Sequence, residues 1–347
     1  MIDTKFNYID ETSQQVARLK INKLILKGSF RNESFNMSAA GKMLVEKFSS
    51  AGIVYIENRE ISFKTGIDVD TRKGYYSINN GEIRLETLHL KTGGWVIDRD
   101  ARQEMYIAIA SSNTSAGKVI SLLPDKYRNL LADYSISGTG DVGLKIKGHF
   151  GGGHTPSIAA QLVLNNGEVM HKKTRVGLEN LSFSGSYLAG ANGKGVNLNV
   201  SNLKAVLRNG TISGNISMSG LQSPFIKASI SGTFDLADVK EFLNSDTITE
   251  FSGKASVSGI FSGQIADIGK PSASDFRNSY FTGTCKLNGV TIGLKGYNLP
   301  VSSLSGDIIF NNNDLSVRVL SGKFGQSDFL VKGSIENLLA RLFVKGE

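Results

Sequence analysis

Residues 211–220, TISGNISMSG, and residues 226–232, IKASISG, decide the fold class of this chain. In the first stretch Ile212, Ile216 and Met218 alternate with serine and asparagine, and the second stretch repeats the pattern. A period of two places successive side chains on opposite faces of a β-strand. Because only one of the two faces is apolar, the pattern predicts an antiparallel sheet that is wetted on one side.

The same alternation recurs along much of the chain. It is found at 142–146, 196–200, 255–257 and 315–319. Asn-Gly pairs stand near such runs, at 80–81, 166–167, 209–210 and 288–289. Because the two central residues of a tight hairpin turn take positive φ, these pairs predict hairpin turns.

Few helices interrupt the predicted strands. Apolar residues at helical spacing predict a helix over 119–131 after Ser115, a second over 236–243 after Asp235, and a third over 335–342 after Ser334. A further short helix is predicted over 43–48. These helices are too few and too short to cover a sheet of many strands.

The order of helix and strands repeats with a period of about 115–120 residues. Gly138 opens the strand region after the first helix, and Gly253 does so after the second. The repeat divides the chain into a partial first unit over 1–115, a second over 116–232 and a third over 233–347. The expected fold is therefore mainly β, an elongated and curved antiparallel sheet with short helices at the repeat junctions.

A one-sided apolar sheet needs a cover, and two arrangements remain open. The sheet can pack on itself as a sandwich with a dry core, or it can curl into a β-groove whose apolar lining holds acyl chains. The candidate lining residues are Val142, Leu144, Ile146, Val196, Leu198, Val200, Ile212, Ile216, Ile226, Ile230, Val257, Val317 and Val319.

Composition and motifs speak against an enzyme and against cofactor or nucleic-acid binding. The net charge is +8, but the basic residues do not cluster. Cys285 is the single cysteine, and the four histidines include no pair at metal-ligand spacing, so we expect no metal site. Residues 138–143, GTGDVG, match a dinucleotide-binding motif, but a strand follows them where that motif needs a helix, and a turn is expected. Asp68 and Asp70 could bind Ca²⁺ or lie on a solvated turn.

Four stretches of the sequence resemble the AsmA-like family of Gram-negative cell-envelope proteins. They are 304–339, which contains LSGDIIF at 304–310 and VLSGKFGQS at 319–327, then GTFDLADV at 232–239, GEIRLETL at 81–88, and LLP at 122–124 followed by Leu130 and Gly138. The resemblance extends over roughly residues 50–345 and rests on glycine and strand patterning.

The resemblance implies a β-groove protein of the periplasm, anchored to the inner membrane, that carries phospholipid between the two membranes. Its expected partners are phospholipid or another acyl-chain lipid, the membrane and envelope proteins. No apolar run reaches the ~18 residues of a membrane-spanning helix, so we expect a fragment without its anchor. Two alternatives stay open: a periplasmic scaffold for outer-membrane protein assembly, and a surface β-sandwich or β-solenoid binding module.

Overall fold

The computed structural model shows a mainly β protein built on one open antiparallel sheet. It describes residues 2–11, 15–50, 53–99, 102–121, 128–151, 153–220, 223–243, 248–267, 275, 279–312 and 314–336. Strands account for 78% and helices for 6% of the structure, and the 18 strands belong to one sheet. The predicted fold class is confirmed: the described strands form one long, open and curved antiparallel sheet.

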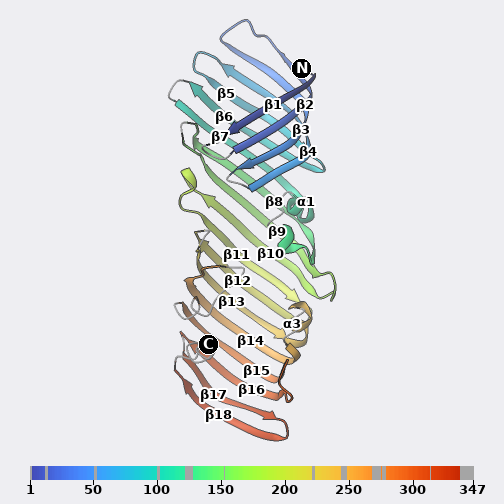
Figure 1. Ribbon diagram of the computed structural model, residues 1–347, viewed down its shortest axis with the longest axis vertical. Helices are drawn as coiled ribbons and strands as arrows, with labels where there is room; N and C mark the ends of the chain where they lie inside the picture. The colour runs from blue at the N-terminus through green and yellow to red at the C-terminus, as the bar shows by residue number, and fades with distance from the viewer. Residues whose placement is uncertain are drawn as a thin grey trace. The chain divides into compact units, whose positions relative to one another are not determined.

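Among the first eight strands, and among the last eight, each strand pairs with the next one along the chain (Figure 1). The strands are β1 (Ile2–Asp10), β2 (Gln15–Gly28), β3 (Ser34–Ser50), β4 (Ile53–Asp70), β5 (Tyr75–Leu85), β6 (Leu88–Arg99), β7 (Arg102–Ser115), β8 (Tyr134–His149), β9 (Ser157–His171), β10 (Gly177–Ala189), β11 (Asn197–Leu207), β12 (Gly210–Ser219), β13 (Phe225–Asp235), β14 (Ile248–Gln264), β15 (Tyr280–Leu294), β16 (Val301–Asn311), β17 (Asp314–Phe324) and β18 (Ser327–Ile335). The helices are α1 (Ala116–Ser121), α3 (Leu236–Leu243) and the 3-10 turns η1 (Asn129–Leu131) and η2 (Ala191–Gly193).

The chain forms two compact units. The first contains residues 1–132, 137–163 and 186–196, and the second contains 133–136, 164–185 and 197–347. Within the first unit the strand direction changes strongly between β1–β4 and β5–β7, although β4 and β5 are paired (Figure 1). The division into three sequence repeats stays a prediction. One local feature agrees with it: Gly138 and Gly253 both have positive φ, 117° and 92°, in the first strand after a helix.

Three of the four Asn-Gly pairs lie inside strands, and the hairpin prediction is wrong for them. Asn80 (φ 49°) is in β5, Asn166 (φ 50°) is in β9, and Gly289 (φ 59°) is in β15. In β5 and β15 the register shifts at the pair, between Ile78 and Gly81 and between Leu287 and Val290, as at a β-bulge. Positive φ serves a bulge as well as a turn, so the dipeptide alone does not separate the two.

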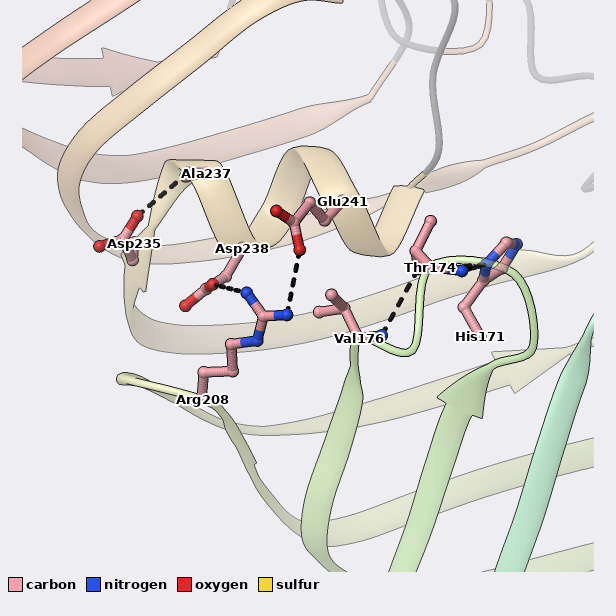
Figure 2. A network of polar contacts seen from close by, with 8 residues as sticks. All are labelled: His171, Thr174, Val176, Arg208, Asp235, Ala237, Asp238 and Glu241. Atoms are coloured by element: carbon pink, nitrogen blue, oxygen red, sulfur yellow. Dashed lines mark hydrogen bonds and ion pairs between the residues drawn. The ribbon is translucent and has the colours of Figure 1, made fainter.

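The fourth pair adjoins a true hairpin turn. Leu207 pairs with Gly210 across the β11–β12 hairpin, and Arg208 and Asn209 form the turn between them. The left-handed residue of this turn is Arg208, with φ 45°. The turn is therefore centred one residue earlier than the sequence predicted, and this position directs the Arg208 side chain toward α3 (Figure 2).

Side chains of neighbouring strands satisfy the amide groups that the bulges leave without ladder partners. The N–H of Asn202 donates to Oδ1 of Asn215 at 3.0 Å, and the N–H of Gly289 donates to Oγ of Ser305 at 2.8 Å. The N–H of Asn113 donates in the same way to Oδ1 of Asp141, at 2.9 Å. Since an unpaired amide is costly to bury, these contacts stabilise the bulges.

The helix predictions met different outcomes. The helix after Asp235 is confirmed as α3, and the N–H of Ala237 donates to Oδ1 of Asp235 at 3.1 Å. The helix over 119–131 is present only as α1 and η1, and residues 122–127 lie outside the described residues. Of the predicted helix over 335–342, Ile335 ends β18, and residues 337–342 also lie outside the described residues.

Two short predictions are wrong because strand pairing overrides local pattern. Residues 43–48 belong to β3, where they pair with β2 on one side and β4 on the other. Residues 138–143 lie inside β8, not in a turn, so the glycine motif there is part of a strand. Hydrogen bonds to neighbouring strands favour an extended backbone whatever the local propensity.

Candidate functional site

The register of the paired strands places most of the predicted lining residues on one face of the second unit. Val257 of β14 lies opposite Cys285 of β15, which lies opposite Ile308 of β16, which lies opposite Val317 of β17. Directly opposed residues share a face. We call this surface the apolar face; its members on β11–β17 include Leu198, Val200, Leu203, Ile212, Ile216, Met218, Ile226, Ala228, Ile230, Phe234, Val257, Phe261, Phe281, Cys285, Leu287, Ile308, Phe310, Val317 and Leu320.

Eight of the thirteen predicted lining residues belong to this face: Leu198, Val200, Ile212, Ile216, Ile226, Ile230, Val257 and Val317. Val142, Leu144 and Ile146 belong to the first unit, where they lie opposite Ser111, Ile109 and Ile107 on β7. Val196 also belongs to the first unit and precedes β11.

Val319 does not lie on the apolar face. The register shifts between Val317 and Leu320 in the β17–β18 ladder, and Leu320 lies opposite Gly306 on the apolar face. Val319 instead lies opposite Asp307 and is 41% exposed. A bulge changes the face of every following residue, so period-two counting through it assigns Val319 to the wrong side.

Helix α3 and the side chains packed under it cover one end of the apolar face. The buried residues of this cluster are Leu236, Ala255, Val290 and Leu304, and Val290 has no exposed surface. Phe234, Val239, Phe251, Leu287, Ile292, Val301, Leu320 and Phe329 pack around them. This cluster, which we call the α3 cluster, is a small dry core.

Much of the rest of the apolar face keeps partial exposure, whereas Val317 is buried. Val257, Cys285 and Ile308 are half-buried, and Ile230 is 40% exposed. The rings of Phe281 and Phe310 pack against each other with centroids 5.5 Å apart. At the last strand, Val331 and Ile335 are 46% and 41% exposed. The apolar face is therefore covered at the α3 cluster and accessible beyond it.

The opposite face of the second unit carries hydroxyl and amide groups. Ser213 and Ser231 share a hydrogen bond of 2.9 Å across β12 and β13, and Thr211 and Thr233 share one of 3.3 Å. Two shallow hollows of about 300 and 410 Å³ lie over β11–β14, lined mainly by this polar face and by the exposed Ile260. Sequence reasoning did not find these hollows, because they depend on the local curvature of the sheet.

An aromatic pair on β5 and β6 of the first unit was also missed. Trp95, the single tryptophan of the chain, stacks on Tyr75 with ring centroids 6.5 Å apart. Nearby, Oδ2 of Asp68 accepts hydrogen bonds from Ser77 and Asn79, and Asp70 accepts one from the N–H of Lys73. That bond is the main cause that lowers the pKa of Asp70. Both carboxylates thus have protein partners, which accounts for them without Ca²⁺.

One arginine holds α3 by two contacts. Nη1 of Arg208 donates to Oδ1 of Asp238 at 2.8 Å, and Nη2 lies 3.0 Å from Oε2 of Glu241 (Figure 2). The hydrogen bond with Asp238 is the main cause that raises the pKa of the Arg208 guanidinium. The Asp238 side chain is only 7% exposed, whereas that of Arg208 is 45% exposed. Oδ2 of Asp238 is buried and has no hydrogen-bond partner.

The described residues contain neither a candidate metal site nor a candidate membrane-spanning helix. No group of three or more His, Cys, Asp or Glu residues within them could hold a metal ion. No helix within them is long and apolar enough to cross a membrane. Burial raises the pKa of the Cys285 thiol, so the thiol is protonated at neutral pH.

Comparisons with known proteins give no relatives. No family model, no curated protein and no solved structure matches this chain.

Proposed function

We propose that the chain binds the acyl chains of phospholipid on its apolar face and so serves lipid transfer in a cell envelope, without catalysis. The observation that carries the proposal is the row of Val257, Cys285 and Ile308, which stays partly exposed on one face of an open sheet. Apolar surface left in water favours an apolar ligand.

The energetics favour lipid over small polar ligands. Each buried methylene group contributes about 0.8 kcal/mol, so one acyl chain in contact with several strands gains several kcal/mol. The apolar face offers branched and aromatic side chains with no charged group among its members. Such a surface has no polar group to fix one position, and a bound lipid can slide along it.

The polar face suits acyl chains less well than the apolar face. Its two hollows combine the apolar Ile260 with polar residues such as Asn215 and Ser229, whose hydrogen-bonding groups an acyl chain cannot satisfy. The proposal therefore assigns acyl chains to the apolar face and leaves the lipid headgroup in water.

The resemblance of 304–339 and 232–239 to the AsmA-like family supports the same proposal. On that basis we propose that the protein acts in the periplasm, at the inner membrane. Its proposed partners are phospholipid, the membrane and envelope proteins.

Lipid extraction and mass spectrometry of the purified protein test the proposal. Two variants of adjacent residues on β14 supply the contrast: Val257→Asp puts a charge on the apolar face, and Ser258→Asp puts the same charge on the polar face. We expect co-purified phospholipid in the wild type and in Ser258→Asp, and several-fold less in Val257→Asp. Wild-type protein that carries no lipid, and takes none from vesicles of phosphatidylethanolamine and phosphatidylglycerol, would refute the proposal.

An assembly scaffold is the second candidate function, and the last strand favours it. Leu330 and Val331 of β18 are 63% and 46% exposed, and β18 is paired through β17. A strand with a free edge can accept a strand from another protein. Leu330→Pro, on the face opposite to the apolar face, should remove such pairing and leave lipid binding intact, whereas Val257→Asp should do the reverse. Cross-linking to envelope proteins measures the first effect.

A further inference from the structure

Helix α3 covers the apolar face at one end, where Arg208 from another hairpin contacts it and Lys240 of the helix donates to the carbonyl oxygen of Thr249. We propose that α3 is a movable cover held closed by Arg208, and that its opening extends the apolar face that acyl chains can occupy. The opening is a property of the protein alone, while its consequence for lipid rests on the proposed function.

The closed position buries the apolar surface of the α3 cluster. Leu236 is 6% exposed and packs with Ala255, Val290 and Leu304. Val239, one turn further along the helix, joins the same cluster. The nearest uncovered part of the apolar face begins at once beyond it, because Ala255 and Val257 are successive residues of the same face of β14. Lifting α3 would join the two surfaces.

The guanidinium group of Arg208 makes the two charge pairs that hold α3, and the Lys240 contact with Thr249 lies on the solvated side. Arg208 comes from the β11–β12 turn, and it contacts Asp238 and Glu241, three residues apart on α3 and thus on the same side of the helix (Figure 2). Asp238 is the buried partner and Glu241, with 50% side-chain exposure, is the solvated one. The Asp238 contact therefore carries most of the fastening, since a charge pair is strengthened by exclusion of water.

The closed position also contains an opposing element. Oδ2 of Asp238 is buried with no hydrogen-bond partner, and a carboxylate in that state favours any movement that returns it to water. Apolar burial and the Arg208 contact favour closure, while hydration of Asp238 favours opening. If Arg208 is removed, the buried charge loses its partner and the balance shifts toward the open state.

Hydrogen–deuterium exchange of the lipid-free protein tests the cover directly. In Arg208→Ala, peptides that contain α3 should exchange about ten- to a hundredfold faster than in the wild type. Asp238→Asn added to Arg208→Ala removes the buried charge and should return most of the protection. Arg208→Lys keeps the charge but cannot span both carboxylates with a fork of donors, so an intermediate rate is expected.

A matched control removes an exposed arginine ion pair of the first unit. Arg72→Ala breaks the pair of Arg72 with Glu33, and α3 should exchange at the wild-type rate. Unchanged exchange of the β16–β17 peptides, which belong to the same unit as α3, shows that this unit of Arg208→Ala is folded, and Arg208→Lys supplies the test if it is not. Wild-type exchange in both arginine variants, or fast exchange that Asp238→Asn does not slow, would overturn the cover.

Lipid uptake measured in parallel separates this proposal from the function on which it depends. Vesicles of phosphatidylethanolamine and phosphatidylglycerol are offered to the wild type and to Arg208→Ala, and bound lipid is quantified after separation. We expect more lipid per protein in Arg208→Ala. Faster exchange with no lipid bound to either protein would refute lipid carriage while the cover stands, and equal lipid with faster exchange would refute the effect of opening on lipid.

Discussion

Cys285 lies directly opposite Val257 in the β14–β15 ladder, with its thiol on the apolar face. It is the single cysteine of the chain and is half-buried. The protein therefore contains a natural chemical reporter at the centre of the proposed lipid site, and no residue has to be introduced to use it.

Bound lipid should shield this thiol. Acyl chains over Val257 and Ile308 would exclude a water-soluble reagent from Cys285, so the protein loaded with phospholipid should react with N-ethylmaleimide several-fold more slowly than the delipidated protein. Intact-mass spectrometry over time measures the rate. Ser258→Asp serves as the control and should keep the protection. Equal rates in loaded and delipidated protein would count against the apolar face as the lipid site.

The pH dependence of the same reaction follows from burial. The thiolate is the reactive form, and burial raises the pKa of Cys285. The thiolate fraction at pH 7–8 is therefore smaller in the folded chain than in the unfolded chain, and alkylation by iodoacetamide should rise with pH through a midpoint above that of an ordinary thiol, about 8.5. Urea-denatured protein should react with the ordinary midpoint. A folded-state midpoint at or below that of the denatured chain would contradict the prediction.

The α3 cluster should supply much of the local stability of the second unit. Val290→Ala removes two methyl groups from a side chain with no exposed surface and should lower the free energy of unfolding by about 2 kcal/mol. Val319→Ala makes the same chemical change at a 41% exposed site on the other face, and should change stability by less than about 0.5 kcal/mol. Urea unfolding curves of the two variants measure the difference, and equal shifts would show that the cluster is not a tight core.

The local alternation of apolar and polar residues was sufficient to predict the strands and the face of the sheet on which most apolar residues lie. Ile212, Ile216 and Val257 alternate with polar neighbours, and strand pairing places all three on one face. Prediction failed at the bulges, since positive φ at Asn80 or Gly289 suits a bulge as well as a turn. A separate register shift in β17 places Val319 on the other face, and counting by two along the sequence does not reveal it. The contact of Arg208 with Asp238 was out of reach, because residues 30 positions apart meet only through the register of three strands.

A last prediction concerns the stability cost of adding a side chain at a glycine that has positive φ inside a strand. Gly94 of β6 has φ 146°, and a Cβ placed there would lie 1.9 Å from the carbonyl oxygen of Tyr106 on the neighbouring strand. Gly94→Ala must therefore separate β6 from β7 or adopt a strained backbone, and we expect a loss of at least about 2 kcal/mol of stability.

Gly143 of β8 is the matched control in the same unit. A Cβ there would have no atom within 4 Å, and its φ is not in the left-handed region, so Gly143→Ala should be neutral or stabilise by up to about 1 kcal/mol through the lower entropy of the unfolded chain. Trp95 follows Gly94 directly and gives a local fluorescence readout beside global urea unfolding. A change in Trp95 emission confined to Gly94→Ala would place the damage at the β6–β7 ladder. Equal stability of the two variants would mean that this ladder accommodates a side chain at Gly94, and the close approach of β6 and β7 would then not be a constraint on the sequence.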